Sequence, residues 1–187
     1  MKIIDLNTWN RKQLYEHFSN LKDPFFSVTI PFDVTQAYSF SKDRGLSFFG
    51  RYLHDCMKAL NGIENFKYRI ENDKVIEYDS IHASATIMRE DKTFGFSFIK
   101  YDEDLNVFLN NLELEKQRIN DSNELYPPQN GLDCMHCSAM PWLNFSGHKE
   151  PVSGLLESVP KLAFGKVTKM NDKWMMNVAI SVNHALV

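Results

Sequence analysis

The sequence predicts a single α/β or α+β domain, and three observations support this prediction. The chain has 187 residues, a length typical of one domain with a substantial core. Stretches in which apolar and polar residues alternate, as in a strand, are interleaved with stretches of helical period. Apolar residues make up 43% of the chain and charged residues 24%, which is ordinary for a globular protein.

Charge, hydropathy and cysteine content exclude several classes of protein. The formal net charge of −3 at pH 7 disfavours a general nucleic-acid binder and a polybasic membrane protein. No apolar run approaches the roughly 20 residues that span a bilayer, and the first residues contain no stretch long enough for a secretory signal. Three cysteines do not describe a disulfide scaffold. We therefore expect a cytoplasmic domain.

The first element is predicted to be a helix. Asn7 or Thr8 can cap it, and Leu14, Phe18 and Leu21 fall on one helical stripe. The Asp-Pro pair that follows is incompatible with a continuing helix and ends it.

The remaining elements follow from changes of period along the chain. Residues 26–34 alternate, which predicts a half-buried strand, and Pro31, which has no N–H to donate, places it at a sheet edge or a bulge. Residues 41–61 have helical period and end at a glycine cap. In order, the later predicted elements are antiparallel strands over 66–100, a long helix capped by Asp102 or Asp104, a loop at 126–131, a strand near 134–143 and a final hairpin that turns at Asn171-Asp172.

The last predicted strand places a histidine at its end. One face carries Trp174, Met176, Val178, Ile180 and Val182, and His184 continues this apolar phase. Such a histidine is either a core residue bonded to a backbone carbonyl, or part of a frayed strand end, or a desolvated and neutral general base. The aromatic fraction of 13% likewise has two readings, a phenylalanine-rich core or a pocket for a flat ligand.

Cys134-Met135-His136-Cys137 is a CxxC motif that encloses a histidine. A structural zinc site needs a second ligand pair at similar spacing, and the one other cysteine, Cys56, stands alone in a predicted helix. A thioredoxin-type motif opens a helix, whereas this one lies in a strand-like segment. Two cysteines on a strand are the favoured interpretation, and no metal is expected.

Motifs spread along the whole chain resemble those of the chloramphenicol acetyltransferase family. This trimeric type is also similar to the catalytic domains of dihydrolipoyl acyltransferases. The motifs that carry the resemblance are Trp9-Asn10-Arg11, Phe26-Ser27-Val28-Thr29, Thr93-Phe94, Leu125-Tyr126-Pro127, the segment from Ser138 through Pro141-Trp142 to Asn144-Phe145, and the segment from Ser181 through His184-Ala185 to Val187.

The resemblance implies a fold, an assembly and a reaction. The fold is a two-layer α/β sandwich with a mixed, largely antiparallel sheet covered on one side by helices. A homotrimer would form active sites between subunits, with His184 from one subunit and the aromatic pocket largely from its neighbour. The reaction is acetyl transfer from acetyl-CoA, a co-substrate, to a hydroxyl of chloramphenicol or a related small molecule, with His184 as general base.

Further residues receive roles from the same resemblance. The acceptor would contact Phe18, Phe94, Phe96 and Tyr126, and Arg11 and Asn144 would support the site. The serine that stabilises the oxyanion in the family falls at Gly147 here, so Ser146 or the backbone N–H of Gly147 would replace it. Phe96 stands where a small residue is usual, which narrows the pocket.

Two departures keep other interpretations open. The family's His-x-x-x-Asp-Gly motif begins at His184, but the chain ends at Val187, before the Asp-Gly and a last helix. Arg11 would then lack its aspartate, so we expect residues 1–187, read as one incomplete acyltransferase domain, to be weakly active or inactive. The alternatives are an acyltransferase for a different hydroxyl or thiol acceptor, and a non-catalytic binding homologue, which the Gly147 substitution favours.

Overall fold

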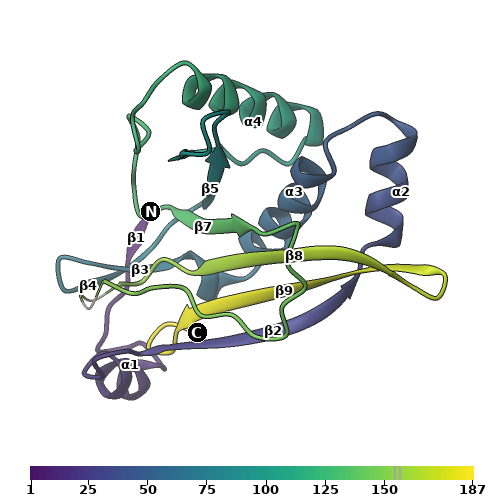
Figure 1. Cartoon of the computed structure of the whole chain (residues 1–187). Coiled ribbons are helices and arrows are strands. Elements are labelled where there is room, and N and C mark those ends of the chain that lie inside the picture. Colours follow the sequence, from purple (N-terminus) through teal and green to yellow (C-terminus); the bar gives the residue numbers. More distant parts are fainter. Residues whose placement is uncertain (154, 156) are drawn as a thin grey trace.

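The computed structural model describes residues 1–153, 155 and 157–187, and most of its strands form one sheet (Figure 1). In chain order the elements are β1 (Lys2–Ile3), α1 (Lys12–Phe18), β2 (Phe25–Asp33), α2 (Thr35–Asp43), α3 (Phe48–Asn61), the 3-10 helix η1 (Glu64–Lys67), β3 (Tyr68–Glu71), β4 (Lys74–Glu77), β5 (His82–Met88), β6 (Phe94–Phe96), α4 (Leu105–Asn120), β7 (Cys134–Ala139), β8 (Lys161–Met170) and β9 (Lys173–Asn183).

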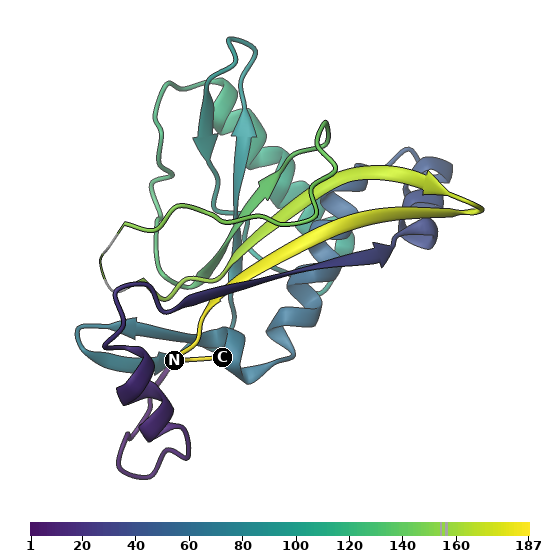
Figure 2. The same ribbon diagram turned by 60° about the horizontal axis from the view of Figure 1, so that its bottom comes forward.

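The large sheet has six strands in the order β2-β9-β8-β7-β5-β6. The outer pairs are antiparallel, and β7 pairs in parallel with both β8 and β5. A second, antiparallel sheet has the order β1-β4-β3. The β8–β9 hairpin is long and extends past the helices (Figures 1 and 2). The prediction of a mixed, largely antiparallel sheet with helices packed on it is therefore confirmed.

Side-chain alternation gives the two faces of this sheet different characters, because successive strand residues point to opposite sides. The helix-covered face forms the main core, which includes Ala83, Ala85, Met135, Leu162 and Phe164 from strands and Leu53, Met57, Phe108 and Leu112 from α3 and α4. The opposite face carries Ser84, His136, Ser138 and Lys161. The segment that follows β7 crosses this face (Figure 2), and its Phe145 packs on β8 and β9.

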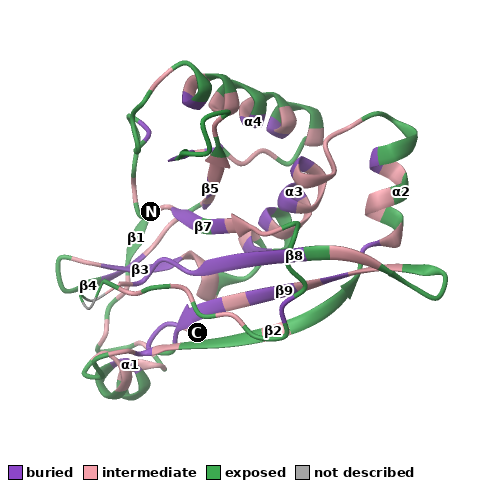
Figure 3. Ribbon diagram, in the orientation of Figure 1, coloured by how far each residue is buried: buried purple, intermediate pink, exposed green. Residues whose placement is uncertain are grey.

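Strand β2 lies at the edge of the sheet, as Pro31 predicts. Its expected apolar row is present but is not half-buried against the core. Phe26, Val28, Ile30 and Phe32 are between 40% and 49% exposed, and Figure 3 shows β2 exposed beside the largely buried β8 and β9. This chain therefore leaves an apolar row open along one edge of its sheet.

The N-terminal helix differs from its prediction. It starts after Arg11 rather than at Asn7 or Thr8, and Leu14 and Leu21 of the predicted stripe are 47% and 45% exposed. Tyr15 is the buried residue of α1, where it packs in a small second core with Tyr68 and Ala185. The stripe prediction is wrong because the preceding turns, rather than the helix, carry much of the contact with this core.

The prediction of one helix over 41–61 is also wrong in its bounds. The chain forms α2 and α3, separated at Gly45, whose φ of +65° belongs to the left-handed region that favours glycine. Ser47 caps α3 by accepting a hydrogen bond from the N–H of Gly50. Asp104 caps α4, as predicted, through the N–H of Asn106. Among the described residues, no helix is both long and apolar enough to cross a membrane.

Candidate active site

His184 lies directly after β9, in a turn that its neighbours hold in place. The N–H groups of Leu186 and Val187 donate to the carbonyl of Asn183, which closes the turn. The buried Asn183 side chain accepts from the N–H of Ala185 at 2.9 Å and donates to the carbonyl of Glu157 at 2.7 Å. The position of His184 is therefore fixed by a buried amide rather than by the strand ladder alone.

The imidazole of His184 has one nitrogen engaged and one available. Its Nδ1 lies 3.0 Å from the carbonyl oxygen of Val187. Because a carbonyl only accepts, Nδ1 carries the proton and Nε2 retains a lone pair. The ring packs against Phe18 and Phe26, with centroid distances of 4.0 and 4.8 Å. This is the tautomer that a general base requires.

One expectation about His184 is wrong for the single chain. Two of the three alternatives for His184, a core residue and a desolvated base, place its side chain on the apolar face of the strand, and the third is a frayed strand end. In the structure β9 ends at Asn183, so the strand period no longer governs His184, and the residue is exposed. Phe18 and Phe26 cover part of the ring, and solvent reaches the rest.

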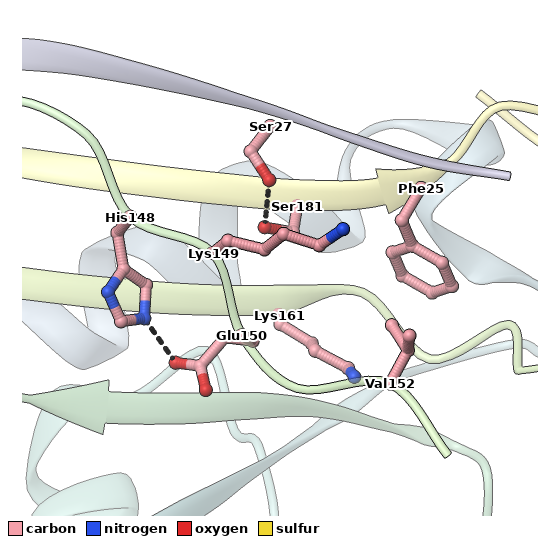
Figure 4. A pocket seen from close by; sticks show the side chains of 8 residues that line it. All are labelled: Phe25, Ser27, His148, Lys149, Glu150, Val152, Lys161 and Ser181. Carbon is pink, nitrogen blue, oxygen red and sulfur yellow. Dashed lines mark hydrogen bonds and ion pairs between the residues drawn. The ribbon is translucent and has the colours of Figure 1, made fainter. Parts of the chain in front are cut away.

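A cavity of about 560 Å³ lies on the helix-free face of the sheet. Phe96 and Tyr126 line it with rings 5.5 Å apart, and Ser138 and His136 project into it from β7. Glu150 and Lys161 belong to its wall and also to a smaller adjoining cavity of about 190 Å³ (Figure 4).

A second large cavity, of about 760 Å³, lies at the end of β7. Its lining is mainly apolar and includes Tyr52, Trp142 and Phe164, with Lys166 at its border. Thr86 and Ser138 line this cavity and the 560 Å³ cavity alike. The two large cavities therefore meet at these two hydroxyl side chains.

The structure divides the predicted acceptor residues between three places. Phe96 and Tyr126 share the 560 Å³ cavity, while Phe94 lines the 760 Å³ cavity and touches Phe96 with a centroid distance of 5.6 Å. Phe18 instead packs on His184. His184 itself lines none of these cavities, so a single chain does not bring the predicted base to the predicted pocket.

The predicted supporting residues lie outside the cavities. Ser146 and Gly147 are exposed, and neither lines any of the three. Asn144 is exposed and accepts from the amide of Asn177 at 3.3 Å. The Nε of Arg11 is buried and has no hydrogen-bond partner among the described residues.

Ser138, Thr86 and His136 were not among the predicted site residues. The signal for them was available, because Ser138 and His136 alternate with Cys137 along β7, which places both on the face opposite the core. The two cysteines of the motif are buried on that strand, as predicted, and burial raises the pKa of Cys134 to about 12. No cluster of three or more metal-ligating side chains occurs in the described part of the chain.

The fold is that of acyltransferase catalytic domains. A dihydrolipoamide acetyltransferase from Azotobacter vinelandii aligns with a TM-score of 0.64 at 15% identity, covering 94% of this chain and 79% of that one, and shares the fold. A solved chloramphenicol acetyltransferase aligns with a TM-score of 0.88 at 28% identity, over 100% of this chain and 91% of that one.

Sequence comparison defines the family. The family model described as chloramphenicol acetyltransferase matches residues 1–187, so the chain belongs to the chloramphenicol acetyltransferase family. A chloramphenicol acetyltransferase from Proteus mirabilis is 25% identical over 186 residues, which cover 98% of this chain and 86% of that protein.

Proposed function

We propose that this protein transfers an acetyl group from acetyl-CoA to a hydroxyl of chloramphenicol or a related small molecule, with His184 as the general base. The single observation that carries this proposal is the state of the His184 ring. Its Nδ1 is held by the Val187 carbonyl at 3.0 Å, which leaves Nε2 free to accept a proton. Membership of the family supports the substrates named.

The proposed reaction is a direct transfer without an acyl-enzyme. Nε2 of His184 accepts the proton of the acceptor hydroxyl as the oxygen attacks the thioester carbonyl, and a tetrahedral oxyanion forms. The carbon–sulfur bond then breaks, and the CoA thiolate takes the proton from the imidazolium. Proximity of two bound substrates supplies much of the remaining rate enhancement.

The oxyanion requires a hydrogen-bond donor, and we assign this role to Ser138. A single such donor is worth about 3 kcal/mol of transition-state stabilisation. The Ser138 hydroxyl lines both large cavities, which is where a thioester and an alcohol would meet. Ser146 and the N–H of Gly147, the donors that the sequence suggested, are the competing assignment.

The two large cavities suit the two substrates. We assign the 560 Å³ cavity, hereafter the acceptor cavity, to the hydroxyl compound, because its aromatic pair Phe96 and Tyr126 suits a flat ring. We assign the 760 Å³ cavity to acetyl-CoA. Trp142 offers apolar surface there, and Lys166 offers a positive charge for the phosphate groups of CoA.

The proposed active form is a homotrimer with sites between subunits. His184 is exposed and lines none of the cavities, so a second copy is needed to bring the base to a pocket and to exclude water from it. The exposed apolar row of β2 includes Phe26, which touches His184, so the same surface would be buried. A heterologous contact of this kind closes as a ring of three.

We place this activity in the cytoplasm, where acetyl-CoA is available. Three free cysteines, two of them buried, suit a reducing compartment.

The direct test is release of CoA thiol from acetyl-CoA in the presence of chloramphenicol. Release that depends on chloramphenicol, together with a product heavier by one acetyl group, is the expected result. Turnover with other hydroxyl or thiol compounds alone would indicate a different acceptor. Absence of turnover with every acceptor, by a chain that continues through the family's Asp-Gly motif, would indicate a binding homologue and overturn the proposal.

A further inference from the structure

The acceptor cavity contains two unlike groups of side chains. Phe96 and Tyr126 form an aromatic surface at one part of it. His136, Glu150 and the Lys161–Glu157 ion pair make another part polar. A ligand that fills the cavity therefore meets apolar and hydrogen-bonding surface together.

His136 is presented to the cavity by a rigid strand. Its neighbours Met135 and Cys137 are buried in the core, whereas His136 itself is exposed, so its side chain points to the cavity face. Its N–H donates to the carbonyl of Pro160 at 3.0 Å, which fixes the backbone. In the described part of the chain the imidazole itself makes no hydrogen bond, so both ring nitrogens are available to a ligand.

Glu150 has one carboxylate oxygen engaged and one available. Figure 4 shows the first, Oε1, accepting from Nε2 of His148 at 2.9 Å. No hydrogen bond to the second oxygen occurs among the described residues. The ammonium of Lys161 donates instead to Glu157 at 2.9 Å and to the carbonyl of Pro151 at 2.6 Å. The contact with His148 therefore orients a carboxylate whose other oxygen is unoccupied.

We propose that His136 and Glu150 bind a hydrogen-bond donor of the acceptor, a hydroxyl or an amine other than the group that is acetylated. This preference for acceptors with a second donor group rests on the proposed function, since it concerns the acceptor of that reaction. Burial and the charge of Lys161 lower the pKa of His136, so its ring is neutral at pH 7 and one nitrogen accepts. A site with unpaired acceptors discriminates against ligands that lack a donor.

Binding of three related compounds tests this selection. Chloramphenicol carries a nitro group, which has no donor, at one end and a dichloroacetylated nitrogen, which has a single amide N–H, at the other. Its second hydroxyl is also a donor and is the same in all three compounds. Reducing the nitro group places an amine at the first end, and removing the dichloroacetyl group places one at the second. We would measure the Kd of each by calorimetry without acetyl-CoA, for the wild type and for His136→Leu, His136→Asn and Glu150→Leu.

The expected result is that one of the two amines binds the wild type about tenfold more tightly than chloramphenicol, the value of one hydrogen bond. His136→Leu and Glu150→Leu should each reduce that ratio toward one. His136→Asn, which keeps a donor and an acceptor, should preserve most of it. Thermal unfolding of each variant separates loss of binding from loss of fold.

Two outcomes decide between the two proposals. If His136→Leu and Glu150→Leu both bind all three compounds as tightly as the wild type does, the role of His136 and Glu150 is overturned. Acetylation of chloramphenicol would stand in that case. The protein could also bind the amines in a way that depends on His136 and yet show no transferase activity. That outcome supports the binding role of His136 and Glu150 and contradicts the proposed function.

Discussion

His184 is the residue on which the proposed chemistry depends. Its Nδ1 is tied to the Val187 carbonyl, and this one contact sets which nitrogen can take a proton. The buried Asn183 in turn sets the geometry of the peptide that carries it. A change at either residue would therefore alter proton transfer before it altered substrate binding.

Replacing His184 by Gln should reduce kcat by about 10²–10⁴-fold, because an amide cannot accept a proton as a general base does. Chloramphenicol-dependent release of CoA thiol measures the effect. Because the side chain is exposed in one chain, the melting temperature of the monomer fold should stay near that of the wild type. A variant with more than half of the normal kcat would remove His184 from the mechanism.

Replacing Ser138 by Ala should reduce kcat about a hundredfold with a small change in KM, because an oxyanion donor acts in the transition state. Ser146→Ala is the matched control, since it removes the same hydroxyl from a position outside the cavities. If the Ser146 variant lost the activity and the Ser138 variant kept it, our assignment of the donor would be reversed.

The sequence predicted which aromatic residues border a cavity better than which polar residues do. Phe96 and Tyr126 share a cavity, whereas Phe18, which was expected to line the same pocket, contacts His184 instead. Ser138 was not predicted because the oxyanion serine of the family was matched to Gly147, and His136 was interpreted only as part of a cysteine motif on a strand. The cavities that they border form only when β5, β7 and two distant loops come together.

Among the elements, the junction of α3 and α4 depends on the absence of a side chain. A Cβ added at Gly50 would lie 2.4 Å from Cδ2 of Leu109 and 3.0 Å from Cδ2 of Leu112. These helices cover the face of the sheet that forms the main core. The distance between α3 and α4 therefore determines how their side chains pack against β5 and β7.

Gly50→Ala should lower the free energy of unfolding by about 1–3 kcal/mol, the usual cost of overpacking. Urea denaturation measures this change. Gly147→Ala serves as the control, because a Cβ there meets nothing within 4 Å. An unchanged midpoint for Gly50→Ala would mean that Leu109 moves aside freely.

Most strands could be predicted from the sequence, and two helices could not. The β3–β4 and β8–β9 hairpins have clear turn residues, and the predicted turns are where the structure has them. The break at Gly45 was hidden because the residues on both sides continue a helical period. No local pattern predicts that β7 pairs in parallel with β5 and β8, since this pairing joins segments far apart in the chain.

At the scale of the whole molecule, one chain does not bring His184 and the acceptor cavity together. In the proposed trimer, each chain therefore contributes His184 to one active site and the cavity to another. The proposed base, His184, lies directly after β9, and the proposed acceptor cavity lies elsewhere on the same sheet. The exposed apolar row of β2 adds a second reason for association, because 40–49% exposure of four large side chains is unusual on a monomer surface.

Two inactive variants should therefore complement each other. We would co-refold His184→Gln with Ser138→Trp, a variant whose added bulk blocks the place where the two large cavities meet. In randomly mixed trimers about a quarter of the interfaces pair an intact base with an intact pocket, so about a quarter of wild-type activity should return. Each variant refolded alone is the control, and mixtures as inactive as the separate variants would show that base and pocket act within one subunit.

The meeting of two separate cavities at Thr86 and Ser138 has a kinetic consequence. In the proposed assignment each reactant occupies its own cavity, so either reactant can bind before the other. Initial-velocity plots against either reactant should then intersect rather than run parallel. Product inhibition should then be competitive within each cavity. CoA should compete with acetyl-CoA, and the acetylated acceptor should compete with the free acceptor.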